Sequence, residues 1–280
     1  MRLGSALIAA ALALTVTVGA GSASAATAGA VKYVALGDSS VAGPGILPQD
    51  FSPCLRSTRN WPNVVAQRLG AELTDVSCNA ATIDDMAGRQ LGFVAPQYEA
   101  LRPDTDLVTI TVGANDIGLG FVVPSCYNAL PQPIGSSCKA RYTAGGVDQL
   151  AGRIAAIAPR VGAVLDEIHR RSPGALVVVV SYATYFKPGG CYPKELIWGV
   201  DADYLQATWD RLHATLAAQA GSHNAEFVDV RTPSMGHGIC ESIAEKWMEG
   251  TLPTSPATPF HPNATGMART GAVVAAAIGA

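Results

Sequence analysis

Charged residues are scarce in this chain of 280 residues. Asp, Glu, Lys and Arg together make up 15% of it, and the formal net charge is −3. Proteins that bind nucleic acid usually present a basic surface to the phosphate backbone. The chain has no such excess of positive charge, so we expect no nucleic-acid partner.

Long apolar runs are missing after the first 25 residues. The single run, "ALIAAALALTVTVGA" over 6–20, follows Arg2 and precedes the small residues Ala23–Ala25. It is shorter than the ~20 residues that a spanning helix needs. This order predicts a secretory signal peptide over 1–25, cleaved after Ala25, with a membrane anchor as the alternative. We therefore expect a secreted, extracellular protein with no transmembrane segment after cleavage.

No Cys-x-x-Cys pair occurs, which removes a common sequence sign of a zinc site. The chain nevertheless has six cysteines, and export favours disulfides. Six cysteines allow about 15 pairings. We favour bonds between neighbours in the sequence, each tying down a loop: Cys54–Cys78, Cys126–Cys138 and Cys191–Cys240. We expect no metal and no cofactor.

Apolar, β-branched runs alternate with segments of helical periodicity. The runs lie at 31–36, 71–77 (the weakest), 106–112, 175–181 and 225–230, and the helical segments at 61–70, 145–174, 203–221 and 266–280. Strands that are apolar throughout and separated by helices indicate a parallel sheet covered on both faces. We expect an α/β protein, a three-layer α/β/α sandwich of flavodoxin-like type, forming a single domain over 26–280.

Polar segments follow three of the predicted strands, and a fourth precedes the last helix. They are "GDSS" (37–40), "CNAAT" (78–82), "GANDIG" (113–118) and "FHPNATG" (260–266). Because ligands bind at the carboxyl edge of such sheets, we expect the four segments to meet there. A serine needs a base to become a nucleophile, and an oxyanion needs N–H donors. Ser39, His261 and Asn115, with a backbone N–H near Ala80, meet these needs.

These segments, in this order, resemble the SGNH or GDSL hydrolase superfamily, and details such as "CLRSTRNWP" (54–62) and "GHGIC" (236–240) are similar to secreted bacterial lipases and esterases with three disulfides. The resemblance implies that Ser39 is the nucleophile and His261 the general base. It implies an oxyanion hole from the N–H groups of Ser39 and Ala80 and the side chain of Asn115. Asp38 is then structural.

Two alanines depart from the family pattern. Ala80 and Ala114 stand where the family has glycines. An alanine still presents a backbone N–H, so we expect the oxyanion hole to survive provided that Ala80 takes a φ below zero.

A third departure affects the histidine. Thr258 occupies the position, three residues before His261, at which most of the family has an aspartate. We expect a backbone carbonyl, of Thr258 or Pro259, to orient the imidazole, which makes the site a Ser–His dyad. A distant carboxylate, Asp201 or Asp203, is the alternative.

Two loops after strands, 121–138 and 185–199, carry apolar and aromatic residues. Phe121, Tyr192, Ile197 and Trp198 either line an acyl-binding groove or pack beneath these loops.

We treat the histidines outside the "FHPN" segment as structural: His169, His213, His223 and His237.

We expect the chain to be an ester hydrolase that acts on acyl or lipid esters through a covalent acyl-enzyme, and we expect it to be a monomer. Phospholipase A, carbohydrate acetylesterase and a non-catalytic secreted binding module are alternatives on the same fold. An α/β-hydrolase is disfavoured because Val41 interrupts the Gly-x-Ser-x-Gly pattern. A chymotrypsin-like protease does not fit the alternation of strands and helices, and a flavodoxin-like cofactor protein leaves Asn115 and His261 unexplained.

Overall fold

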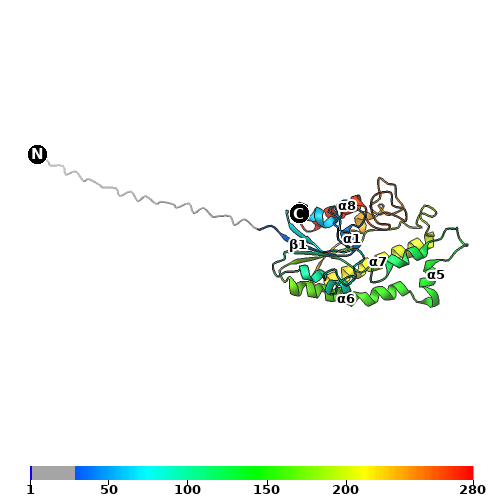
Figure 1. The fold of residues 1–280 in the computed structure, drawn as a ribbon, viewed down its shortest axis with the longest axis horizontal. Helices are drawn as coiled ribbons and strands as arrows, with labels where there is room; N and C mark the ends of the chain where they lie inside the picture. The colour runs from blue at the N-terminus through cyan, green and yellow to red at the C-terminus, as the bar shows by residue number, and fades with distance from the viewer. Residues whose placement is uncertain (2–28, 280) are drawn as a thin grey trace.

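A five-stranded parallel sheet forms the centre of the computed structural model, which describes Met1 and residues 29–279 (Figure 1). The strand order is β2-β1-β3-β4-β5. The strands are β1 (Lys32–Gly37), β2 (Glu72–Asp75), β3 (Leu107–Thr111), β4 (Leu176–Val180) and β5 (Glu226–Val228). All four pairings are parallel, as predicted. Strands β2 to β5 lie inside their predicted runs, and β1 extends one residue beyond its run, to Gly37.

Helices cover both faces of the sheet, with α6 and α7 on one side and α1 and α8 on the other (Figure 1). The α-helices are α1 (Ser39–Ala42), α2 (Trp61–Leu69), α3 (Asp84–Ala87), α4 (Leu119–Val122), α5 (Cys138–Tyr142), α6 (Gln149–Arg171), α7 (Gly199–Ser222) and α8 (Ala264–Ala277). Short 3-10 turns lie at Gln97–Ala100, Pro124–Cys126, Ala144–Gly146 and Thr232–Ser234. The α/β sandwich is therefore confirmed.

Successive residues of β1 enter two separate cores. Val34 and Leu36 pack with the apolar side chains of α6 and α7, whereas Tyr33 and Ala35 pack with those of α2 and α8. Side chains alternate between the two faces of a strand, so a strand covered on both sides must be apolar throughout. Burial on both faces holds the sheet in place between the helices, and it therefore fixes the position of the edge at which the strands end.

Capping residues set the helix boundaries. Helix α6 begins four residues after the predicted start because Gly145 and Gly146 take positive φ values and Asp148 caps the helix. Helix α7 begins at Gly199, four residues before the predicted start. The sequence reasoning missed the short helices α1, α3, α4 and α5, which are too brief to show a helical period.

Disulfides join the same cysteine pairs that the sequence favoured. Cys54–Cys78 links the loop before α2 to the loop after β2, and Cys191–Cys240 links the loops after β4 and β5. Cys126–Cys138 closes the loop before α5. All three therefore tie down connections rather than core elements.

The signal peptide expected over 1–25, with cleavage after Ala25, lies outside the residues that the structure describes. Over the described part of the chain, every helix is too short or too polar to cross a bilayer.

Candidate active site

Ser39 is the first residue of helix α1, which follows the end of strand β1 after Asp38 alone. Gly37 ends the strand with a φ of 140°, and a Cβ there would lie 2.5 Å from the carbonyl oxygen of Thr111. Only glycine fits this close approach. Asp38 caps α1, since its carboxylate accepts from the N–H of Ser40 at 2.8 Å. The chain thus turns from strand to helix at Asp38, and Ser39 borders a cavity.

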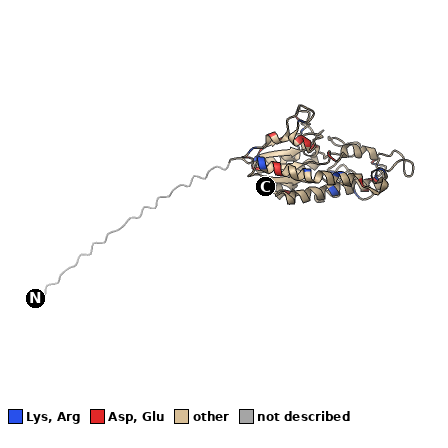
Figure 2. Ribbon diagram, turned by 90° about the horizontal axis from the view of Figure 1, so that it is seen from below, with Lys and Arg blue, Asp and Glu red and all other residues tan. Residues whose placement is uncertain are grey.

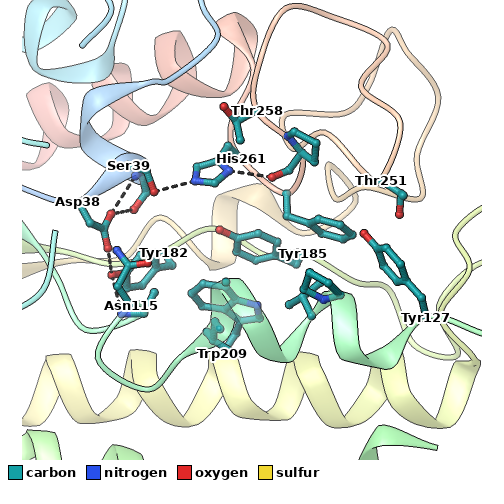
Figure 3. A pocket seen from close by; sticks show the side chains of 18 residues that line it. Asp38, Ser39, Asn115, Tyr127, Tyr182, Tyr185, Trp209, Thr251, Thr258 and His261 are labelled. Carbon is teal, nitrogen blue, oxygen red and sulfur yellow. Dashed lines mark hydrogen bonds between the residues drawn. The ribbon is translucent and has the colours of Figure 1, made fainter. Parts of the chain in front are cut away.

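His261 reaches Ser39 from the segment before helix α8 (Figure 3). Its Nε2 lies 2.7 Å from Ser39 Oγ, and its Nδ1 lies 2.8 Å from the carbonyl oxygen of Pro259. A carbonyl can only accept, so Nδ1 carries the proton and Nε2 is left to accept from the serine hydroxyl. Of the two carbonyls expected, that of Pro259 makes this contact. Thr258 instead donates its N–H to the carbonyl of Pro44.

Within the described chain, no carboxylate contacts the imidazole of His261. Asp201 accepts from the hydroxyl of Ser137 at 2.6 Å, and Asp203 accepts from the N–H of Gly189 at 2.7 Å. The alternative in which Asp201 or Asp203 orients the histidine is therefore wrong.

Burial sets the protonation state of His261. Desolvation disfavours the imidazolium and lowers the pKa of the ring below its ordinary value, while the hydrogen bond to Pro259 acts in the opposite direction. The ring is therefore neutral at neutral pH, and a neutral imidazole is the form that can accept a proton.

A buried ion pair fixes the loop that carries His261. The carboxylate of Glu249 lies 2.6 Å from Lys246 Nζ and accepts from the amide of Asn263 at 2.8 Å. The Glu249 backbone donates to the carbonyl of His261 and accepts from the N–H of Phe260. Glu249 thus positions the backbone around the histidine without touching the ring. Nothing in the sequence distinguished this role.

Asn115 lies opposite Ser39 at the carboxyl end of strand β3 and lines the same cavity (Figure 3). Its side-chain amide donates one N–H to the carbonyl of Ala81 at 2.9 Å, which fixes its orientation. A second N–H of the amide is left for a ligand. The backbone N–H of Ser39 donates to no acceptor among the described residues. Both groups can therefore donate to an oxyanion.

Ala80 takes a φ of +62°, so the expectation of a negative φ is wrong. It occupies the third position of a turn that is closed by a bond from the N–H of Ala81 to the carbonyl of Cys78. This turn type needs a positive φ at that position and prefers glycine there. The N–H of Ala80 has no acceptor in the described chain, but Ala80 is not among the residues that line the cavity.

A buried tyrosine that the sequence reasoning missed links the turns after β1 and β3. The hydroxyl of Tyr182 donates to the carboxylate of Asp38 at 2.5 Å and accepts from the N–H of Ala114 at 3.1 Å. Burial raises the pKa of Asp38 to about 6, against the lowering effect of the bonds from Ser40 and Tyr182. Asp38 is therefore structural, as expected, and holds the nucleophile turn to the strand beside it. In the sequence, Tyr182 is a single tyrosine directly after a predicted strand, and tyrosines at such positions are too common to indicate this role.

The cavity beside Ser39 has a volume of about 540 Å³ and is mostly apolar (Figure 3). Trp209 of helix α7 forms part of its wall, stacked on Tyr185 with ring centroids 4.2 Å apart and an interplanar angle of 5°. Leu119, Val123 and Tyr127 are further apolar lining residues. An apolar volume of this size next to a nucleophile can hold an acyl chain.

None of the four residues named for the groove lines this cavity. Ile197 and Trp198 are buried under their loop, the Tyr192 hydroxyl donates to a loop carbonyl, and the Phe121 side chain is 87% exposed. The two loops contribute instead through other residues, among them Val123, Pro124, Tyr127 and Tyr185. Polarity patterns cannot say which loop side chains turn inward.

The remaining histidines lie away from Ser39. His237 stacks on Trp247 with centroids 4.4 Å apart, and its Nδ1 bonds to the carbonyl of Glu245. His169 and His213 lie on α6 and α7, and His223 caps the end of α7. Over the described residues, no cluster of three potential metal ligands forms.

Comparison with known proteins gives concordant results. The model of the GDSL-like Lipase/Acylhydrolase family matches residues 35–269. Lipase 2 of Streptomyces coelicolor is 37% identical over 85% of this chain and 82% of its own length, and a lipase of Streptomyces rimosus is 33% identical over 86% and 84%.

Two solved structures cover 90% of this chain and 100% of their own. The extracellular lipase of Streptomyces rimosus has a TM-score of 0.72 at 28% identity, and phospholipase A1 of Streptomyces albidoflavus has 0.71 at 25%. The chain is thus similar to lipases in both sequence and fold.

Proposed function

The chain belongs to the GDSL-like Lipase/Acylhydrolase family and is a lipase or esterase, and from that premise we propose that Ser39 and His261 act as a catalytic dyad. The observation that carries the proposal is the chain of two hydrogen bonds from Ser39 Oγ through the imidazole to the carbonyl of Pro259. This arrangement leaves Nε2 as the acceptor, which is the state that a general base requires.

The reaction proceeds in two steps at this geometry. Ser39 Oγ attacks the ester carbonyl as its proton passes to His261 Nε2, and the Asn115 amide and the Ser39 N–H donate to the oxyanion. The Ala80 N–H is the third donor proposed because it has no acceptor in the described chain, although Ala80 takes a positive φ and is not among the residues that line the cavity. His261 then gives its proton to the leaving alcohol, which leaves an acyl-enzyme on Ser39 that water hydrolyses by the same route. The Pro259 carbonyl keeps Nδ1 protonated throughout.

The apolar cavity supports esters with an extended acyl chain as substrates. Its wall of Trp209, Tyr185, Leu119 and Val123 offers an apolar surface to the chain rather than hydrogen bonds to a sugar. This favours lipid esters over carbohydrate acetyl esters. A phospholipase A activity is the second candidate, because a structural relative is named phospholipase A1. The close Ser39–His261 contact argues against a non-catalytic binding module.

Secretion is the location that we infer. Three disulfides occur in the chain, and disulfides persist mainly in oxidising compartments. A structural relative is described as an extracellular lipase. The enzyme would then act outside the cell after removal of residues 1–25. We propose separately that it is a monomer.

Hydrolysis of p-nitrophenyl esters by purified Ser39→Ala and His261→Ala variants tests the dyad. We expect each change to lower kcat about 10³-fold or more, because proton transfer and nucleophilic attack are lost together. Ser242→Ala and His223→Ala serve as matched controls, since both side chains lie outside the site. Activity that survives Ser39→Ala in a folded protein would contradict the mechanism.

A further inference from the structure

Two charge-free stretches of the chain flank the cavity. Residues 117–138 and 250–260 contain no Asp, Glu, Lys, Arg or His, although 15% of the whole chain is charged. We call these two stretches the mouth loops. Both contribute to the cavity, through residues such as Val123 and Tyr127 from the first and Thr251 and Phe260 from the second. Charged residues are sparse along the ribbon as a whole (Figure 2), but here they are absent.

The mouth loops also expose large apolar side chains. Phe121 is 87% exposed and Leu252 is 82% exposed, and Leu130 and Ile134 of the first loop are more than half exposed. Such side chains are unremarkable when scattered singly, but several around one opening mark a surface that binds something apolar.

Phe121 lies at the rim of the cavity. Its neighbours Gly120 and Pro124 are exposed and line the cavity at the same time, so they stand where the cavity meets solvent. Phe121 lies in helix α4, three positions before Pro124 at the start of the next turn, and positions three apart lie on the same side of a helical turn. Leu252 follows Thr251, a lining residue of the second mouth loop. Phe121 and Leu252 are thus exposed apolar residues of the two mouth loops, and each directly follows a residue that lines the cavity.

We propose that the mouth loops dock the enzyme on the surface of an uncharged or zwitterionic lipid aggregate, with Phe121 and Leu252 entering its apolar layer. The inference rests on the proposed function for the identity of the bound ester. Without cations, the mouth loops cannot attract anionic headgroups, and without anions they repel none. A protein bound there would cover the entrance of the cavity, whereas a lipid surface delivers the ester into it. An acyl chain would then pass from the aggregate to the cavity without crossing water.

Flotation with lipid particles tests this proposal. The Ser39→Ala variant is used so that no lipid is consumed, with phosphatidylcholine vesicles, triacylglycerol emulsion droplets and phosphatidylglycerol vesicles as probes. We expect binding to the first two, nearly unchanged between about 0.05 and about 0.5 M NaCl, because apolar insertion is not screened by salt. Adding the substitutions Phe121→Ser and Leu252→Ser to the Ser39→Ala variant should lower its partition coefficient for these lipid particles about 10- to 100-fold.

Ile243→Ser is the matched control for Leu252→Ser. Ile243 is 67% exposed but stands near Glu241, Glu245 and Lys246, outside the mouth loops. Its removal should leave binding unchanged. Absence of binding, unchanged binding by the double variant, or binding only to anionic vesicles that salt abolishes would each overturn the proposal.

A soluble ester separates this proposal from the proposed function. With Ser39 present, the Phe121→Ser, Leu252→Ser variant should hydrolyse p-nitrophenyl acetate as fast as the unmodified chain and lose activity only on emulsified esters. An equal loss on both substrates would show that the two residues serve the site and not docking. Failure of the unmodified chain to cleave any ester would contradict the dyad, while the vesicle measurement would still decide the docking surface.

Discussion

The two ends of the cavity are built by different forces. At the polar end, Ser39, His261 and Asn115 are each oriented by hydrogen bonds, at distances between 2.7 and 2.9 Å. At the apolar end, Tyr185 and Trp209 are fixed by stacking and burial. Hydrogen bonds fix direction, whereas packing fixes volume. The polar end should therefore govern the rate for every ester, and the apolar end should govern which acyl chain is accepted.

Asn115→Ala gives the largest effect expected at the polar end. Loss of one oxyanion donor should lower kcat about 10²- to 10³-fold. The loss should be the same for acetyl and dodecanoyl p-nitrophenyl esters, because both pass through the same oxyanion. Steady-state kinetics on both esters measure it, with Asn63→Ala on helix α2 as the matched control. A loss confined to one acyl-chain length would contradict the view that the polar end governs the rate for every ester and that only the apolar end governs acyl-chain preference.

Val123→Phe tests the apolar end. Val123 lines the cavity and is buried, so a larger ring occupies volume that a long acyl chain needs. We expect the ratio of kcat/KM for the dodecanoyl ester to that for the acetyl ester to fall about tenfold, since space for one or two methylenes is worth about 1–3 kcal/mol. Val147→Phe, on an exposed residue outside the cavity, should leave the ratio unchanged. An equal loss of kcat/KM on both esters would show instead that Val123 supports the positions of the catalytic residues.

The pH dependence sharpens the comparison further. His261 must be neutral to accept a proton, and burial lowers its pKa. Activity should therefore be full at neutral pH and fall as pH decreases through a value below the ordinary histidine value of about 6.5. The acid limb of kcat/KM should have the same midpoint for acetyl and dodecanoyl esters, because it belongs to the polar end. A midpoint above the ordinary value would contradict the burial argument.

Asp38 titrates in a neighbouring range, since burial raises its pKa to about 6. The Asp38→Asn variant shows how much of the acid limb of kcat/KM comes from the titration of Asp38. The midpoint that remains in this variant belongs to His261.

Ala80→Gly carries the smallest effect. Glycine takes a positive φ without the steric cost that alanine has there, so the change should stabilise the fold by about 0.5–1 kcal/mol. Activity should change by no more than about twofold, since the backbone N–H stays in place. Thermal unfolding measures the shift. Ala156→Gly, in the exposed interior of helix α6, should have the opposite sign. Equal destabilisation by both changes would mean that the turn at Ala80 is unstrained.

The sequence alone determined the sheet, the large helices and the polar segments at the strand ends. A strand covered on both faces is apolar throughout, and a turn that presents a nucleophile needs glycine and a capping aspartate, so both leave local patterns. The resemblance carried by these segments then pointed to Ser39, Asn115 and His261.

Only the tertiary structure decided what depends on contacts between distant segments. It held Asp201 and Asp203 in other contacts, so that His261 bonds to Pro259, and it brought Tyr182 to Asp38. It also chose which loop side chains face the cavity. Hydrogen bonds and packing between residues more than a hundred positions apart depend on how elements dock, and no local pattern records that docking.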